Sequence, residues 1–552
     1  MRFGWPILLT GLLAGCTRQP AVTQVEQSHE SAAARQSIRV ENEALLTNAA
    51  GNVETASLLA SAASGFASPF YWLAFHTEAA NVPDLRTRKT GIDWPTFLGP
   101  HRQSTSPETG IIAPWPKKGL RIVWQREIGT GYGMPVISKG RLFHFDRVDR
   151  RRQRAMWGFA QFGGFCSLTP HFWPNLVYLS IDPSQLVDTA RLTCLKSETG
   201  EFLWDFHYPT FYEDDYGYNN GPRCSPVVDG DRVYIYGVDG MLVCLNAVTG
   251  KKLWQIDTVK RFNVVKNFFG VGSTPIIEGD LLIAQVGGSP KGEVRRLNQK
   301  SNHTAVVAFD KYTGKVKYAV GDDLASYSSP VIATIGKKRW CFVLARGGLI
   351  GMEPATGKIR FHFPWRAKIF ESVNASCPVV VGDHVFISET YGAGSALLKI
   401  VGDSYKVVWS DANNGFRNKI MECHWNTPIY HEGYLYGCSG RHSHNAVLRC
   451  IELATGKIMW SEPNLTRSSL LKVDGHFVCM SENGHLRLLK INPKKYEEVS
   501  HLVLRRETPD SSDDEGDLLL RPPCWEAPIL AHGLLYVRGA DRLVCLELIP
   551  QR

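Results

Sequence analysis

The residues of this chain that could bind a ligand stand in short polar and aromatic segments, each shortly before a proline that opens an apolar stretch. The segments read YEDDYGYNNGPRC, VKNFFGVGS, ESVNAS, MECHWN and PPCWEA. Amide and carboxylate oxygens suit a hard cation such as Ca²⁺, and an arginine can pair with a carboxylate ligand. The side chains that we expect to converge are Tyr218, Asn219, Asn220, Arg223, Asn267, Glu371, Asn374, Glu422, His424, Trp425, Asn426, Trp525 and Glu526. The alternative is that they cap the starts of strands and satisfy one another.

A second group of candidate ligands is the pair His442 and His444, two residues apart. On a strand both rings would point to the same face, as a metal site requires. No third ligand stands nearby, so exposed histidines at a hairpin tip are the better interpretation. The chain also lacks a serine nucleophile elbow, a glycine-rich phosphate loop and a Cys-x-x-Cys pair, which leaves no recognisable catalytic motif.

A sequence repeat predicts the strands and turns that must position these residues. It reads LTCLKSETGEFLW (192–204), LVCLNAVTGKKLW (242–254), VVAFDKYTGKVKY (306–318), LIGMEPATGKIRF (349–361) and LRCIELATGKIMW (448–460). The apolar run predicts a buried strand, and the glycine allows the positive φ of a tight turn. The closing aromatic residue can fill the wedge between neighbouring units. A repeat of about 40–50 residues with several short strands is typical of a propeller blade.

The other half of each unit begins with the proline. SPVVDGDRVYIY (225–236) and TPIIEGDLLIAQ (274–285) are examples, and a proline is tolerated as the first residue of a strand. Such starts occur at 135, 226, 275, 330, 378, 428, near 468 and at 528. They predict an all-β, eight-bladed propeller. The last unit lacks a fourth strand, and an unassigned strand at 120–129 precedes the first unit, so we expect this N-terminal strand to close the ring. An open solenoid is the alternative.

The first residues resemble a bacterial lipoprotein signal peptide. Leu13-Ala14-Gly15-Cys16 resembles the lipobox, so we expect residues 1–15 to be removed and Cys16 to carry lipid. An outer-membrane location facing the periplasm is favoured over the inner membrane, and an ordinary cleaved signal peptide is the alternative. Residues 16–92 are rich in Ala, Ser, Glu and Gln and predict a flexible tether. Its uncharged stretch 55–75 is either a membrane-associated helix or a short helix or coil on a surface.

The propeller, residues 93–552, carries a basic and aromatic insertion in its first blade at 147–190. The insertion either docks on anionic headgroups or a partner protein, or folds back with its arginines in solvent. The net charge of +9, from 62 Lys and Arg against 53 Asp and Glu, is modest for 552 residues. No nucleic-acid-binding pattern accompanies it, so we expect no nucleic-acid partner.

The cysteines recur at equivalent positions. Cys194, Cys244 and Cys450 share one strand position in different repeats, where cysteine serves as a small apolar residue. Export would permit disulfides, with Cys423–Cys438 as one candidate.

The phrases LNAVTGKKLW, EPATGKIRF and ELATGKIMW resemble the repeat of pyrroloquinoline-quinone (PQQ) enzymes, a family with an eight-bladed quinoprotein alcohol dehydrogenase-like propeller. The similarity spans about residues 93–552. DWPTFLGPHRQSTSPETGI (93–111), with NNGPRCSPVVDGD and NFFGVGSTPIIEGD, resembles more narrowly a group of exported bacterial propeller proteins similar to BamB, the lipoprotein of the outer-membrane barrel assembly machinery. The resemblance implies the fold, and it is poorly specific for activity.

The dehydrogenases of this family stack PQQ on a tryptophan beneath a vicinal disulfide, hold Ca²⁺ with Glu and Asn, and use an aspartate as base. This chain has no adjacent cysteines and no aspartate on a matching motif, although Trp425 or Trp525 would serve as the floor. BamB in turn lacks the arginine-rich insertion and the long tether.

We therefore expect a monomeric, lipid-anchored propeller that acts as a scaffold for envelope proteins without catalysis of its own and without an assigned cofactor. Two alternatives stay open. One is an oxidoreductase that uses PQQ and Ca²⁺ at an atypical axial site, and the other is a sensor of a small ligand or glycan.

Overall fold

The computed structural model describes residues 82–149, 187–265, 268–289, 300–369, 372, 374–506 and 517–551. Several predictions from the sequence concern other residues: the signal peptide 1–15, the lipidation of Cys16, the stretch 55–75, most of the insertion 147–190, and the candidate ligands Asn267 and Glu371. These stay predictions. Within the described residues, no helix is both long enough and apolar enough to cross a membrane.

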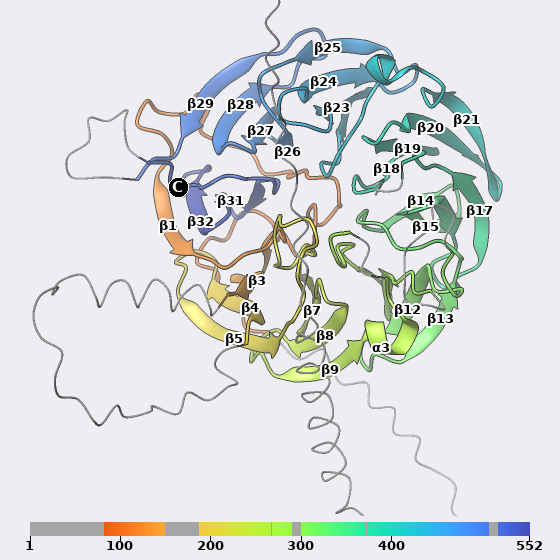
Figure 1. Cartoon of the computed structure of the whole chain (residues 1–552). Coiled ribbons are helices and arrows are strands. Elements are labelled where there is room, and N and C mark those ends of the chain that lie inside the picture. Colours follow the sequence, from red (N-terminus) through yellow and green to blue (C-terminus); the bar gives the residue numbers. More distant parts are fainter. Residues whose placement is uncertain are drawn as a thin grey trace, which may run out of the picture. The chain divides into compact units, whose positions relative to one another are not determined.

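Eight four-stranded antiparallel sheets stand in a ring within the described residues, which confirms the predicted eight-bladed propeller (Figure 1). Blades 1 to 4 comprise β2 (Val136–Ser138), β3 (Arg141–Val148), β4 (Thr189–Lys196), β5 (Phe202–Pro209); β6 (Val227–Asp229), β7 (Arg232–Tyr236), β8 (Met241–Asn246), β9 (Lys252–Asp257); β10 (Ile276–Glu278), β11 (Leu281–Gln285), β12 (Val306–Asp310), β13 (Val316–Val320); β14 (Val331–Ile335), β15 (Lys338–Ala345), β16 (Gly348–Met352) and β17 (Ile359–Pro364).

Blades 5 to 8 follow the same plan. They comprise β18 (Val379–Val381), β19 (His384–Glu389), β20 (Gly394–Val401), β21 (Ser404–Ser410); β22 (Ile429–His431), β23 (Tyr434–Ser439), β24 (Val447–Glu452), β25 (Ile458–Glu462); β26 (Ser468–Val473), β27 (His476–Ser481), β28 (His485–Lys490), β29 (Glu498–Val503); and β30 (Ile529–Ala531), β31 (Leu534–Arg538), β32 (Arg542–Glu547) with β1 (Ile122–Glu127). The short helices α3 (Thr258–Phe262) and η2 (Phe416–Asn418) lie in connections.

The ring closes through its two ends, as the sequence predicted. Strand β1 pairs antiparallel with β32, with Trp124 opposite Cys545 and Arg126 opposite Leu543. In Figure 1 the orange β1 lies beside the blue β32. Blade 8 is thus assembled from both ends of the propeller, which leaves its last strand without a free edge.

The recurrent phrase joins neighbouring blades through an aromatic ring and a glycine. Gly250 has a φ of 72°, and a Cβ there would lie 2.6 Å from the ring of Trp204 in the preceding blade. The same relation holds between Gly314 and Trp254, whose Nε1 donates to the Lys311 carbonyl at 3.0 Å. The aromatic residue therefore does fill the wedge between blades, and only a glycine lets it approach.

The core is divided among the blade interfaces. Each hydrophobic cluster of the described residues contains side chains from neighbouring blades, for example Tyr234 and Phe309 from blades 2 and 3. The eleven described cysteines are buried free thiols, so Cys423 and Cys438 form no disulfide. Cys194 and Cys244 lie directly across from Trp204 and Trp254, where a small side chain leaves room for the indole.

An N-terminal strap, residues 82–112, lies against the turns that join the first two strands of blades 1, 7 and 8. The Leu85 amide donates to the Lys139 carbonyl, and Trp94 forms a bridge with Ile137. Residues 82–92, which we placed in the tether from the sequence, thus contact the propeller. This contact depends on partners distant in sequence, such as Glu547, which pairs with Arg88 at 2.5 Å.

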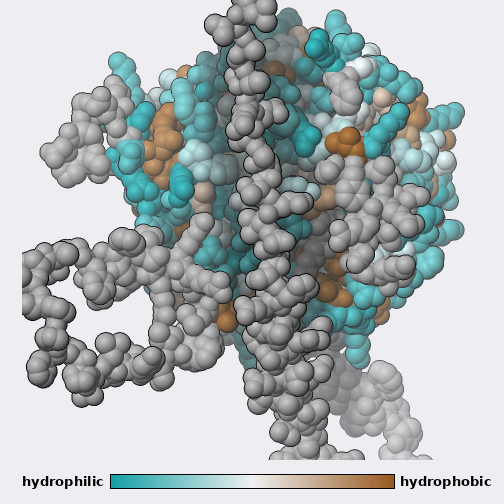
Figure 2. Space-filling view, in the orientation of Figure 1, coloured by the Kyte–Doolittle hydropathy of each residue, from teal (hydrophilic) through white to brown (hydrophobic). Residues whose placement is uncertain are grey.

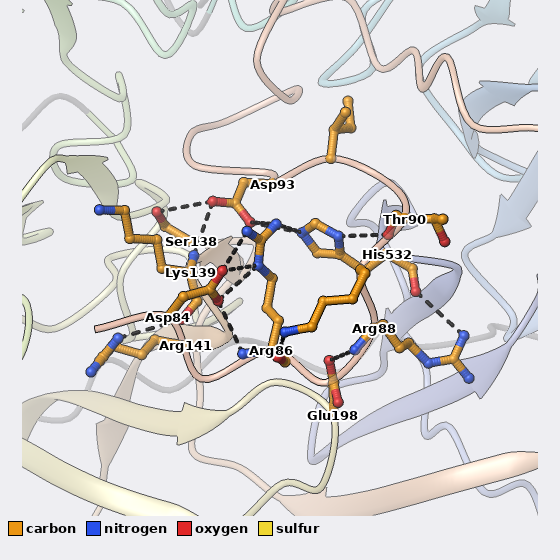
Figure 3. Close-up of polar contacts among 12 residues, drawn as sticks. Asp84, Arg86, Arg88, Thr90, Asp93, Ser138, Lys139, Arg141, Glu198 and His532 are labelled. Atoms are coloured by element: carbon orange, nitrogen blue, oxygen red, sulfur yellow. Dashed lines mark hydrogen bonds and ion pairs between the residues drawn. The ribbon is translucent and has the colours of Figure 1, made fainter. Parts of the chain in front are cut away.

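A histidine holds the strap in place (Figure 3). His532 lies with Nε2 2.8 Å from Asp93 Oδ1 and Nδ1 2.9 Å from the Thr90 carbonyl. Glu108 accepts from the backbone amides of His532 and Gly533, at 3.1 and 2.7 Å. The strap is therefore fixed to blade 8 by buried polar contacts.

The insertion connects β3 to β4, and its described ends include the last residues of β3 and the first residues of β4. Arg147, which we grouped with the basic cluster, is only 4% exposed and pairs with Asp188 at 2.6 Å. The face of the molecule in Figure 2 is largely hydrophilic where it is described, with scattered hydrophobic patches.

Candidate functional site

The segments that precede the innermost strands meet at the axis of the ring and enclose a pocket of about 310 Å³, here called the axial pocket. All eight blades contribute to its wall. The residues that precede these strands and line it are Tyr132 and Met134; Tyr216, Tyr218 and Arg223; Phe268, Phe269 and Gly272; Tyr327; Ala375; residues 424–427; Arg467; and residues 525–527.

Part of the candidate set predicted from the sequence lines this pocket. The members that do so are Tyr218, Arg223, His424, Trp425, Asn426, Trp525 and Glu526. They come from blades 2, 6 and 8, so the segments MECHWN and PPCWEA, which lie a hundred residues apart, are brought face to face. Asn426 also serves the fold, because its Nδ2 donates to the Cys438 carbonyl at 2.9 Å.

The other described candidates act locally. Asn219 Oδ1 accepts from the Gly221 amide at 2.7 Å, and Asn220 Oδ1 accepts from the Asp214 amide at 2.8 Å. Asn374 Nδ2 donates to the Ala345 carbonyl at 2.6 Å. Glu422 stands outside the pocket wall. These asparagines shape the loops, as their short amides commonly do.

Two indoles that pack against each other at an interplanar angle of 38° form one wall of the axial pocket. The rings of Trp425 and Trp525 lie 4.6 Å apart, and Trp425 Nε1 donates to the Trp525 carbonyl at 3.0 Å. The guanidinium of Arg467 lies 4.6 Å from the centre of Trp425. Glu482 accepts from both Arg467 Nε and Trp525 Nε1, at 2.8 and 3.0 Å, so the wall is rigid and its charge is balanced.

Arginines also lie over two further rings of the wall, those of Tyr132 and Tyr391. Arg223, paired with Asp214 at 2.6 Å, lies 5.5 Å from the centre of Tyr132. Arg441 lies 4.5 Å from the centre of Tyr391, and the described residues offer it no carboxylate within ion-pair distance. The pocket wall thus supplies its own cations to its π-faces.

Several of these residues were missed from the sequence: Tyr132, Tyr327, Tyr391, Arg441 and Arg467. Arg467 precedes the degenerate seventh start, and Tyr391 and Arg441 lie in connections between second and third strands, which we did not expect to reach the axis. His442 also lines the pocket and stacks on His444 at 5.5 Å. Both rings are exposed, as predicted for the hairpin tip.

Burial sets the protonation of the two titratable groups beside the indoles. It lowers the pKa of His424 to about 3, with the charges of Arg467 and Arg441 acting in the same direction, so the ring is neutral. It raises the pKa of Glu526 to about 7. One Glu526 oxygen lies 3.4 Å from Arg538 Nε, and the other is buried without a hydrogen-bond partner in the described structure.

One end of the axial pocket is closed by the strap. Phe97, Leu98 and Ser104 line the pocket, and the strap on either side of them is tied to blades 1 and 7 by the bridges Trp94–Ile137 and Thr105–Lys472. The opposite end carries exposed aromatic residues, with Tyr216 50% and Tyr218 62% exposed. Among the described residues, the strap therefore covers one end of the pocket and exposed tyrosines border its opening.

The wall fits a planar anion better than a metal ion. Aromatic rings and guanidinium groups would suit a quinone carboxylate. In the described part of the chain, no three His, Cys, Asp or Glu side chains gather as metal ligands, and of the described asparagines expected for Ca²⁺ only Asn426 lines the pocket.

Comparison with known proteins points to two groups. A family described as "Outer membrane protein assembly factor BamB" matches residues 188–462. A protein of that name from Moranella endobia is 22% identical over 50% of this chain and 68% of its own length. The quinohemoprotein alcohol dehydrogenase of Comamonas testosteroni is 23% identical over 75% of this chain, which spans 51% of that relative's length.

The solved structure of that dehydrogenase covers 83% of this chain and is itself 81% covered, with a TM-score of 0.51 and 11% identity. At this identity the likeness shows the fold alone. Together these matches confirm the predicted resemblance to PQQ-like repeat propellers and to BamB.

Proposed function

We propose that this PQQ-like repeat propeller is a lipid-anchored scaffold of the bacterial envelope that binds partner proteins at the open end of its axial pocket. The observation that carries the proposal is the pocket wall itself: aromatic rings from all sides, faced by arginines, around an opening with exposed tyrosines. Aromatic and arginine side chains are the types most enriched where proteins bind one another. The similarity to BamB supports an envelope partner.

The wall supports binding rather than proton transfer. His424 is neutral with a pKa of about 3, which makes it a weak base at neutral pH. Glu526 is directed toward Arg538, and the described wall offers no serine, cysteine or lysine nucleophile next to a base.

A photo-crosslinking amino acid at Tyr218 tests the partner. In cells, we expect position 218 to capture an envelope protein, because its side chain stands at the opening. The matched control is the same substitution at Lys337, an exposed position on the turn between β14 and β15. Equal capture at both positions, or capture of nothing but the chain itself, would refute the proposal.

The anchor has its own test. Cys16→Ser is expected to move the protein from the membrane to the soluble fraction, whereas Cys166→Ser should not. Membrane retention of the Cys16 variant would assign the attachment to residues 55–75 or to the insertion.

A second candidate function, an oxidoreductase, is favoured by the adjacent indoles of Trp425 and Trp525 beside Arg467. A bound quinone would supply a two-electron acceptor there. Purified protein given PQQ and Ca²⁺ should then show bound-quinone absorbance and reduce a dye with alcohols or sugars. That result would replace the scaffold proposal.

A further inference from the structure

Within the described residues, the strap lies across one end of the axial pocket, and this restricts what a partner protein can place in it. Phe97 and Leu98 of the strap line the pocket, and the strap is tied to blade 1 through Trp94 and to blade 7 through Thr105. A polypeptide that enters from the open side cannot pass through the ring. It must either turn back inside about 310 Å³ or end there. A chain terminus fits this restriction better than a reversed loop, because it places only one segment of polypeptide in the pocket.

The charge of the wall decides between the two ends of a polypeptide. Three of the π-faces that would attract an ammonium group already face guanidinium groups, at 5.5 Å for Tyr132, 4.5 Å for Tyr391 and 4.6 Å for Trp425. An N-terminal ammonium would therefore meet cations of its own sign. A carboxylate would be attracted, and arginine binds carboxylates with two parallel hydrogen bonds.

Arg441 is the arginine that is free to accept this carboxylate. Arg223 is neutralised by Asp214 and Arg467 by Glu482, at 2.6 and 2.5 Å. Arg441 has no such carboxylate among the described residues, and its ring contact with Tyr391 leaves the edge of the guanidinium unused. A cation without a counter-ion on a partly buried wall attracts an anionic ligand electrostatically.

The aromatic residues at the opening favour an aromatic side chain. Tyr218 lies 5.8 Å from Phe269 and 6.4 Å from Trp525, so it links the phenyl and indole sides of the opening. It is 62% exposed. Ring edges presented at such spacing offer offset and edge-to-face contacts to another ring.

We propose that the axial pocket binds the C-terminal residue of a partner polypeptide, with its free carboxylate on Arg441 and a preference for an aromatic side chain beside Tyr218. This inference rests on the proposed function and names the part of the partner that is recognised. A small aromatic acid shares the same two chemical groups and is separated from a chain end by the test.

The test uses the full-length protein in detergent and fluorescent octapeptides of one neutral sequence. The three peptides end in Phe with a free carboxylate, in Phe with an amide, and in Ala with a free carboxylate. We expect the Phe acid to bind about tenfold or more tightly than the Phe amide, because a charge-assisted hydrogen bond is lost. The Phe acid should also bind more tightly than the Ala acid.

Two variants assign the preferences to residues. Arg441→Gln should abolish the difference between acid and amide, and Tyr218→Ala should abolish the difference between Phe and Ala. Arg417→Gln, an exposed arginine outside the pocket, is the control and should change neither. Unchanged thermal unfolding of each variant shows that the fold is intact.

Three results would overturn the inference: equal binding of acid and amide, acid binding that survives Arg441→Gln, or direct binding of free phenylpropionate or PQQ when none of the peptides binds. If none of the peptides binds but position 218 still crosslinks to an envelope protein, the chain-end inference is refuted and the scaffold proposal stands. Loss of crosslinking as well would refute both.

Discussion

Glu526 is a buried carboxyl on the pocket wall whose protonation should affect stability. Burial raises its pKa from 4.5 to about 7, so the folded protein holds a proton that the unfolded chain releases above pH 4.5. Stability associated with this group is therefore complete at low pH and declines as the pH rises toward 7. We expect Glu526→Gln to unfold like the wild type near pH 4.5 and to be more stable by about 1–3 kcal/mol near pH 8, measured by urea denaturation.

The matched control is Glu422→Gln. Burial also raises the pKa of Glu422 to about 7, but Glu422 lies outside the pocket wall. Each variant should lose the part of the pH dependence that its own carboxyl contributes, and only Glu526→Gln should strengthen the binding of an anionic peptide at high pH. Equal pH profiles for the wild type and both variants would contradict the assignment.

At this scale the sequence revealed part of the site. Trp425, Trp525 and Arg223 were found because they directly precede an innermost strand, and every such segment reaches the axis. Asn219 and Asn220 were expected in the same wall but bond to their own loop. Arg441 and Tyr391 enter the pocket from connections between second and third strands. Their position depends on how the blades pack, which a local sequence pattern does not predict.

The contact between a glycine and an aromatic ring is the element that joins successive blades, and it can be tested within blade 2. Gly250 and Gly230 both have positive φ, 72° and 60°. A Cβ on Gly250 would lie 2.6 Å from Trp204, whereas one on Gly230 has nothing within 4 Å. Gly230→Ala should cost about 1 kcal/mol from backbone strain, and Gly250→Ala about 2–4 kcal/mol because overpacking adds to it.

Denaturation of the two variants measures the difference, which isolates the contact with Trp204. If both alanines cost the same, the ring does not pack against the turn as described. These turns and strands were predictable from the sequence because hairpins are encoded locally, by an apolar run, a turn glycine and an aromatic residue. The sequence predicted that the aromatic residue fills the space between neighbouring blades, but it did not predict that this residue contacts the turn glycine of the next blade.

Closure of the whole ring depends on Trp124 of β1. Its Nε1 donates to the Ser197 carbonyl at 2.8 Å, and its ring packs on Gly200 of blade 1. Trp124→Ala should cost about 3–5 kcal/mol and open the joint between blades 8 and 1. Native-state proteolysis should then cut near both ends of the propeller.

Trp254→Ala is the control, because it removes a chemically similar contact between blades 2 and 3, which remain joined by the chain. It should destabilise the protein without exposing both ends. Identical cleavage patterns would contradict the special role of the joint. The joint was predictable because the first unit has a surplus strand and the last unit lacks one. The strap was not, since its contacts with His532 and Glu547 join residues more than 400 positions apart.

The pairing of β1 with β32 also means that the first strand of the propeller is synthesised long before its partner. A ribosome releases β1 long before β32, and at about 5–20 residues per second the intervening chain takes roughly 20–80 s to make. During that interval β1 has a bare hydrogen-bonding edge that can pair with the wrong strand. We therefore expect chaperones to be needed most by the segment that contains β1, until blade 8 forms and β32 pairs with it.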